Sequence, residues 1–233
     1  YEIQNKPDLK ILLQPKTYGI GEVDVYGQLL IYKKMLQNVV SNINKNYISK
    51  PYNYEGYFKY SRQVDGQEKV KEATVTIYDA QGYHREDVAS AFKELNYKFN
   101  QVRRNSEVTS VWDGLTYFDD ILTADIVRNT RNVLDIVNSR DYKLKSKGKL
   151  VYEGDSVQVI SYQATHPSIS TTGDPAVQTY SGEIYVNLKD LAVLKNVVNL
   201  TSRDFNGLGR NLVTINEKPK SDVKMTITTT YKK

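Results

Sequence analysis

The pattern of apolar and polar positions predicts a chain built mainly from β-strands. The clearest part covers residues 150–188. There, Glu153-Gly154-Asp155-Ser156 is a turn signal between two apolar runs, and Gly154 can adopt φ > 0 without a Cβ clash. Within residues 180–188, apolar and polar residues alternate with a period of two, as in a strand with one buried face and one wet face. We therefore expect this stretch to form the middle of an antiparallel sheet.

The same alternation recurs on both sides of this stretch. It predicts a hairpin over residues 54–78 with its turn at Asp65-Gly66, and later strands that begin near Tyr142, Ala192 and Met225. Residues 189–191 are expected to connect two of these strands. At the start of the chain, residues 8–14 and 20–26 predict two short strands.

Three segments have helical spacing instead. Residues 28–43 carry an apolar stripe with lysines and amides between its members, which predicts an amphipathic helix of about four turns. Shorter helices are predicted over residues 85–98 and over residues 122–137, the latter broken near Asn129. The expected fold class is α+β: a curved antiparallel meander, or half-barrel, packed against a few amphipathic helices.

The amino-acid composition argues against some classes of function. The formal net charge is +5 and the lysines and arginines are scattered among acids, so we do not expect nucleic acid as a partner. The chain has no cysteine, which excludes disulfides and thiol catalysis. It has 19 tyrosines, which suit half-buried strand faces because the ring packs while the hydroxyl reaches water.

The sequence offers no convincing catalytic constellation. His84 and His166 each lack a second histidine nearby, so we expect neither a metal nor a cofactor, and we interpret both as exposed or locally hydrogen-bonded. Asp119-Asp120 is interpreted as a helix N-terminal signal, and Gly207-Leu208-Gly209 as a loop. No Gly-x-Ser-x-Gly elbow is present. The chain is therefore not expected to be an enzyme; a hydrolase would need a Ser/His/Asp group to converge on one of the two histidines.

Three stretches carry a resemblance to a known family. Residues 9–26 read LKILLQPKTYGIGEVDVY, residues 29–61 carry a helix followed by Asn-Tyr, Pro and a Gly-Tyr-Phe strand, and residues 180–187 read YSGEIYVN. In this order they resemble envelope proteins of Bacteroidota-type bacteria that carry a carboxypeptidase-regulatory-like domain. Asn187 stands where that family commonly has Asp. The strand at 182–186 is also similar, at the level of the fold, to strands of lipoprotein-carrier-type half-barrels.

The resemblance implies a domain division and a location. Residues 1–26 would be the closing strands of a carboxypeptidase-regulatory-like β-sandwich, and residues 27–233 an α+β antiparallel-sheet domain that continues beyond Lys233. The protein would be periplasmic or associated with the outer membrane, with its signal segment outside this chain. Any membrane association would come through segments outside the chain as well.

These inferences lead to a binding or structural protein of the cell envelope. The first hypothesis is that a curved sheet holds an apolar ligand or a protein partner. The alternative is a glycan- or peptide-binding module that uses exposed tyrosines. The candidate residues are, for the apolar site, Val157, Val159, Ile184, Val186 and Leu188, and, for the tyrosine site, Tyr57, Tyr78 and Tyr185.

Overall fold

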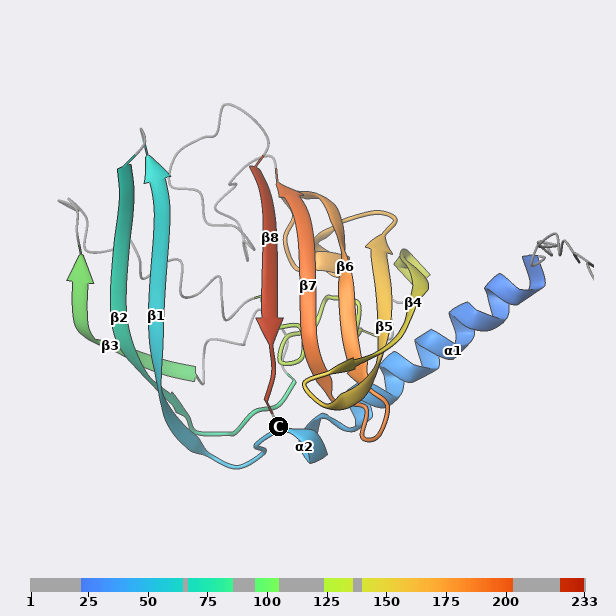
Figure 1. Ribbon diagram of the computed structural model, residues 1–233, viewed down its shortest axis with the longest axis horizontal. Coiled ribbons are helices and arrows are strands. Elements are labelled where there is room, and N and C mark those ends of the chain that lie inside the picture. The colour runs from blue at the N-terminus through green and yellow to red at the C-terminus, as the bar shows by residue number, and fades with distance from the viewer. Residues whose placement is uncertain are drawn as a thin grey trace, which may run out of the picture.

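In a computed structural model, the described part of the chain forms two antiparallel sheets and a few helices (Figure 1). The structure describes residues 22–64, 67–85, 95–104, 124–135, 140–202 and 223–232. The predicted α+β class with antiparallel sheets is confirmed. The predicted strand at residues 8–14, the turn at Asp65-Gly66 and the segments around Asp119-Asp120 and Gly207-Leu208-Gly209 lie outside the described residues.

The larger sheet has five strands in the order β4-β5-β6-β7-β8, which is also their order along the chain. Each strand pairs antiparallel with the next, so the predicted meander is confirmed. The turn between β4 and β5 has Glu153 at φ 50° and Gly154 at φ 88°, as the turn signal predicted. The strands are β4 (Tyr142–Tyr152), β5 (Asp155–Ala164), β6 (Val177–Asn187), β7 (Val193–Ser202) and β8 (Val223–Thr230).

The smaller sheet has three strands in the order β1-β2-β3: β1 (Tyr52–Val64), β2 (Gln67–Asp79) and β3 (Leu95–Arg104). The predicted hairpin is therefore confirmed, with longer strands than the alternation indicated. Phe58, Val75 and Ile77 are buried on one face of this sheet, and Tyr97 and Phe99 of β3 pack against them.

The long helix α1 (Glu22–Ser41) runs past the β4 side of the larger sheet, and its N-terminal part projects beyond the sheet (Figure 1). Its Leu36 and Val39 enter the main core together with Ile43 of the short helix α2 (Ile43–Asn46), as the apolar stripe predicted. Another short helix, α4 (Ile169–Thr172), connects β5 to β6. It has a capping box between Ser168 and Thr171 and ends at Gly173, which has φ 76°.

The two faces of the larger sheet are buried differently. The inner face, which carries Ile160, Tyr162 and Ile184, packs against α1 and residues 124–135 in the main core. The outer face is the opposite one. It carries a small separate cluster in which Val157 and Val159 lie beneath Tyr152. In Figure 1 the end of the β4–β5 hairpin bends across the sheet on the side away from α1, which explains how residues of an outer face become buried.

Three sequence predictions of local structure are wrong. Residues 22–26 belong to α1 and not to a strand, because no proline separates them from the helix and a formed helix extends by one hydrogen bond per residue. Residues 95–98, predicted as helix, belong to β3, where Tyr97 and Phe99 follow a period of two.

Residues 124–135, predicted as helix, form consecutive turns. Their side chains form hydrogen bonds with backbone N–H and C=O groups that would bond to one another in a helix. The Asp125 carboxylate accepts the N–H groups of Val127 and Arg128 at 3.0 and 3.2 Å. The Asn132 amide donates to the carbonyls of Ile126 and Asn129 at 3.1 and 2.6 Å. Such local side-chain bonds compete directly with helix formation.

Candidate functional site

The inner face of the larger sheet is the main apolar surface of the protein. Strand alternation places Ile160, Ile184 and Val198 on this face, all at most 3% exposed. Met225 and Ile227 of β8 lie at its margin and are only partly buried. The inner face is therefore closed in the middle and less completely covered at the β8 edge.

Two recesses open onto the inner face. The first lies between α1 and β4, and its lining includes Leu36, Leu134 and Leu144 with Lys33 and Asp135. Its cavity volume is about 10 Å³, which is room for about one water molecule. It is smaller than the roughly 300–1,000 Å³ typical of sites that enclose a whole small molecule.

The second recess lies at the β6–β8 side of the same face. Its lining is mostly apolar and includes Ile126, Val198, Leu200 and Ile227, with the Asn132 side chain among them. Its cavity volume is likewise about 10 Å³. The two recesses share one sheet face, and each has room for about one water molecule, so a bound apolar group would have to displace the segments that cover the sheet.

Tyrosines line the inner face near the second recess. The rings of Tyr142, Tyr162 and Tyr180 lie with their centroids 6.0–6.4 Å apart. Burial raises the pKa of the Tyr142 and Tyr162 hydroxyls, so both stay protonated at neutral pH. The Tyr162 hydroxyl donates to Oδ1 of Asn196 at 3.0 Å. The ring of Tyr162 lies over Gly182, where a Cβ atom would come within 2.6 Å of it.

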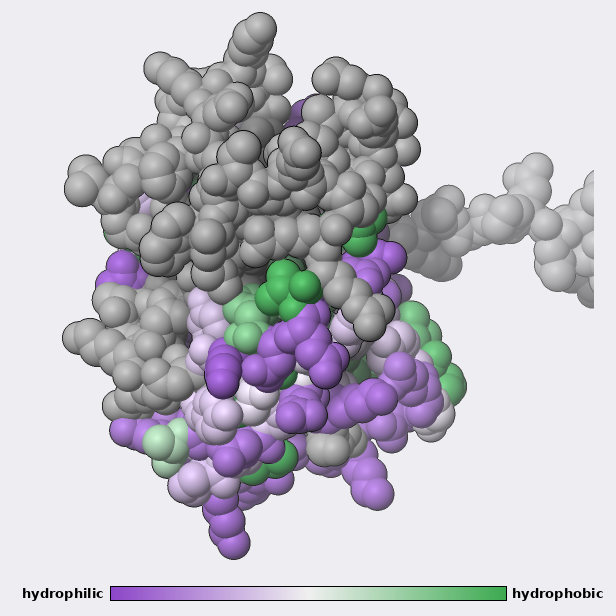
Figure 2. Space-filling view, turned by 90° about the vertical axis from the view of Figure 1, so that its left-hand side faces the viewer, coloured by the Kyte–Doolittle hydropathy of each residue, from purple (hydrophilic) through white to green (hydrophobic). Residues whose placement is uncertain are grey.

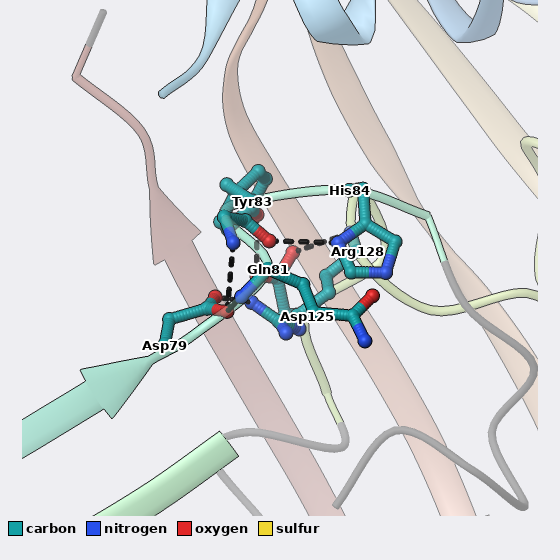
Figure 3. Close-up of polar contacts among 7 residues, drawn as sticks. Asp79, Gln81, Tyr83, His84, Asp125 and Arg128 are labelled. Carbon is teal, nitrogen blue, oxygen red and sulfur yellow. Dashed lines mark hydrogen bonds and ion pairs between the residues drawn. The ribbon is translucent and has the colours of Figure 1, made fainter. Parts of the chain in front are cut away.

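A cluster of buried polar groups joins the smaller sheet to residues 124–135, and we call it the polar joint (Figure 3). At the end of β2, Asp79 is 1% exposed and its Oδ2 accepts a bond from Nη1 of Arg128 at 2.6 Å. Its Oδ1 accepts the N–H groups of Gln81 and Gly82 at 3.1 and 3.0 Å. The Arg128 guanidinium also lies over the ring of Tyr83, 5.7 Å from its centroid.

Asp125 is the second carboxylate of the polar joint. Its two oxygens accept the hydroxyl groups of Tyr83 and Tyr231, the latter at 3.0 Å. The Tyr47 ring packs on the rings of Tyr83 and Tyr231, and its hydroxyl bonds the carbonyl of Val193 in β7 at 2.9 Å. Burial raises the pKa of all three hydroxyls, and the Asp125 carboxylate raises it further. Asp125 therefore connects the segment that follows β2 of the smaller sheet with the segment that follows β8 of the larger sheet.

Arg85 completes the polar joint. Its Nη1 donates to the carbonyls of Ile126 and Val127 at 2.9 and 3.3 Å. Burial lowers the pKa of this guanidinium. The neighbouring His84 has Nδ1 2.7 Å from the carbonyl oxygen of Gly82, which confirms the predicted local hydrogen bond. With Asp79 paired to Arg128 and its hydroxyls protonated, the joint serves to hold the two sheets together.

The structure does not bring the predicted apolar site residues onto one face. Ile184 and Val186 are fully buried in the main core beneath the inner face. Val157 and Val159 belong to the outer-face cluster, opposite to them. Leu188 lies in the turn after β6, where its N–H donates to the carbonyl of Ser156 at 2.9 Å. Pairing β5 with β6 places Val157 opposite Asn187, so the five residues do not line one surface, and their role in ligand binding stays a prediction.

The three tyrosines of the alternative site are also separated. Tyr57 and Tyr78 are 64% and 43% exposed on the smaller sheet, on the face opposite to Phe58 and Ile77. Tyr185 lies on the larger sheet, paired with Tyr152 at 5.7 Å. Among the residues coloured in Figure 2, which views the molecule from the side of the smaller sheet, the hydrophobic ones form small groups between hydrophilic ones.

Sequence reasoning missed the polar joint. Asp79 and Arg128 are 49 residues apart, and Arg128 falls in a segment predicted to be helical. One local signal was present: Asp79 precedes Gly82 by three residues, a spacing typical of a carboxylate that accepts turn N–H groups.

The part of the chain that the structure describes has no candidate metal site and no candidate membrane-spanning helix. No group of three or more His, Asp or Glu residues there could hold a metal ion. No helix there is long and apolar enough to span a membrane.

Comparisons with known proteins find likeness only among solved structures. No protein-family model matches the sequence, and no curated protein sequence matches it significantly. The resemblance to carboxypeptidase-regulatory-like proteins is therefore supported by neither comparison.

Three of the similar structures have sequence identities of 10–11%. A DUF1329 family protein from Desulfovibrio piger is 11% identical over 74% of this chain and 78% of its own, with a TM-score of 0.29. The Mycobacterium tuberculosis lipoprotein LppX is 10% identical over 72% and 88%, with a TM-score of 0.31. A LolA superfamily protein from Nitrosomonas europaea is 11% identical over 83% and 91%, with a TM-score of 0.28. Scores this low establish neither a family nor a function.

Proposed function

We propose that this protein is a non-enzymatic binding protein that holds an apolar segment of a ligand against the inner face of its larger sheet. The observation that carries the proposal is the pair of recesses on that one face, each lined largely by apolar side chains. We place the protein in the periplasm or at the outer membrane, in keeping with the resemblance of residues 180–186 to envelope proteins.

The second recess is the better candidate for the site. Its lining residue Ile227 is only partly buried and belongs to β8, the last strand of the sheet. Each methylene group removed from water contributes about 0.8 kcal/mol, so an apolar chain that displaced the covering segments there would be held without any polar recognition. Asn132, the one amide side chain in the lining, is engaged by the turns of residues 124–135.

Calorimetric titration with decanoate tests the proposal. Ile227→Trp fills the second recess and is expected to weaken decanoate binding by about tenfold or more, the equivalent of two lost methylene contacts. Thr228→Trp is the matched control, since Thr228 is the next residue of the same strand and is exposed on the opposite face. Equal affinities for the two variants, or no heat of binding to the unaltered protein, would overturn the proposal.

The alternative of a glycan- or peptide-binding module is less well supported. It needs a surface of several tyrosine rings, whereas Tyr57 and Tyr78 lie on one sheet and Tyr185 on the other.

A further inference from the structure

The outer face of the larger sheet carries a concentration of positive charge. Strand pairing places Lys143 and Lys145 of β4 opposite Gln163 and Ser161 of β5. These partners point away from the main core, because their neighbours Tyr162 and Ala164 are the buried residues. The two lysines therefore stand on the outer face, and both are exposed.

Three further lysines share this face. Lys147 lies at the β4 bulge and is 3.8 Å from the Glu183 carboxylate. Lys195 has its ammonium group over the rings of Tyr152 and Tyr185, 5.8 and 5.2 Å from their centroids. Lys224 of β8 is exposed, next to inward-facing Met225. We call these five residues the basic outer face: Lys143, Lys145, Lys147, Lys195 and Lys224.

Few acids compensate the basic outer face. Among the described strand residues, Glu183 is the one acid that strand pairing places among these lysines. Glu153 and Asp190 lie in turns and Asp155 begins β5, all at one end of the sheet. The exposed positions near the lysines are mostly uncharged and polar, among them Asn199, whose Oδ1 accepts a bond from the Thr226 hydroxyl at 2.7 Å, while Val197 beside it is half-buried. The surface is therefore cationic and hydrophilic.

The spacing of these charges fits an extended anionic surface. Five strands about 4.8 Å apart spread the lysines over roughly 20 Å. Lys143, Lys145 and Lys147 follow one another along β4 at about 7 Å intervals, within about one Debye length at physiological salt, whereas Lys195 and Lys224 lie farther across the sheet. A flat anionic surface can contact all five at once. All five are lysines, which act as point charges, and not arginines, which suit bidentate recognition of single phosphates. Tyr152 and Tyr185 are of the residue type that is enriched at membrane–water interfaces.

We propose that the basic outer face docks this protein onto the surface of a bilayer that contains anionic phospholipids. The docking uses the face opposite to the recesses, so an inner-face ligand and the membrane are held by different residues. The attraction is electrostatic and reversible, and it leaves the strands outside the hydrocarbon.

Sedimentation with lipid vesicles tests this proposal. The unaltered protein is expected to bind vesicles of phosphatidylcholine mixed with phosphatidylglycerol, to release them in high salt, and to ignore vesicles of phosphatidylcholine alone. The triple variant Lys143→Gln/Lys145→Gln/Lys224→Gln is expected to bind the mixed vesicles on the order of 100-fold more weakly, about fivefold for each lysine. These three side chains are exposed, so the fold should persist.

A second triple variant provides the matched control. Lys34→Gln/Lys45→Gln/Lys50→Gln removes the same charge from exposed positions in α1, in α2 and in the loop after α2. It is expected to change vesicle binding by less than about threefold, because charges beyond a Debye length from the lipid are screened. Decanoate binding should be unchanged in both triple variants, so the two proposals can fail separately.

Three outcomes would overturn the docking proposal. The first is an equal loss of vesicle binding in both triple variants, which would indicate attraction by net charge alone. The second is equal binding to both vesicle types, or none to either. The third is tighter binding to duplex DNA than to the mixed vesicles, lost in the first triple variant, which would assign the face to a soluble polyanion.

Discussion

Replacing Asp79 with alanine should break the joint between the two sheets. Asp79 is 1% exposed and accepts three bonds, from Arg128 and from the N–H groups of Gln81 and Gly82. The substitution leaves the Arg128 guanidinium, 6% exposed in its side chain, without its carboxylate partner. Removing one member of a buried ion pair typically costs about 3–5 kcal/mol, much of it from the charge left behind.

Two further variants distinguish the contribution of the Asp79 charge to stability from the contribution of its hydrogen bonds. Asp79→Asn keeps an oxygen for the N–H groups of Gln81 and Gly82 and should lose less stability than Asp79→Ala. The double variant Asp79→Leu/Arg128→Met removes both charges and is expected to recover most of the loss, because apolar groups often replace buried ion pairs without penalty.

The assay is urea unfolding followed by circular dichroism, with Glu72→Gln as the control. Lys59 and Glu72 form an exposed pair at 3.9 Å, with side chains 52% and 31% exposed. Its loss should change the free energy of unfolding by less than about 1 kcal/mol. The reasoning would be refuted if Asp79→Ala cost no more than Glu72→Gln, or if the double variant were less stable than Asp79→Ala.

Two more predictions concern the core and the pH dependence of stability. Gly182→Ala should lower the free energy of unfolding by about 3 kcal/mol, since its Cβ would meet the Val197 carbonyl oxygen at 2.1 Å. Gly27→Ala in α1, with nothing within 4 Å of the new Cβ, should raise it by about 1 kcal/mol; equal effects in urea unfolding would contradict this packing. Burial raises the folded-state pKa of several tyrosine hydroxyls above its unfolded-state value. The free energy of unfolding is therefore fully retained below about pH 10, where these hydroxyls are protonated in both states, and decreases as the pH rises towards the folded-state pKa values. Each should contribute a slope of about 1.4 kcal/mol per pH unit, and a flat profile from about pH 9 to pH 11 would contradict it. These tyrosines are Tyr47, Tyr83, Tyr142, Tyr162 and Tyr231.

The sequence predicted the strands of the larger sheet well because local pattern and tertiary environment agree there. The alternation over residues 180–188 matches a strand buried on one face, and Gly154 stands where the turn requires positive φ. Residues 124–135 were mispredicted because their apolar spacing is helical while Asp125 and Asn132 satisfy the backbone as turns.

The candidate site could not be assembled from alternation alone. A bulge between Ser146 and Gly148 shifts the register of β4 and increases its twist, and the hairpin end bends over the outer face. Val157 and Val159 are buried there and not with Ile184. The pairing of Asp79 with Arg128 likewise depends on how the two sheets meet, which no short-range pattern encodes.

Photo-cross-linking with a diazirine derivative of decanoate tests the central claim most directly. Mass spectrometry of the labelled protein would locate the adducts on β8, whose residues alternate between the two faces of the sheet. We expect adducts on Met225 and Ile227, which lie on the sheet face that carries the second recess, and on Val198, which pairs with Ile227. Adducts on Thr226 and Thr228, or an even spread over both faces, would contradict it.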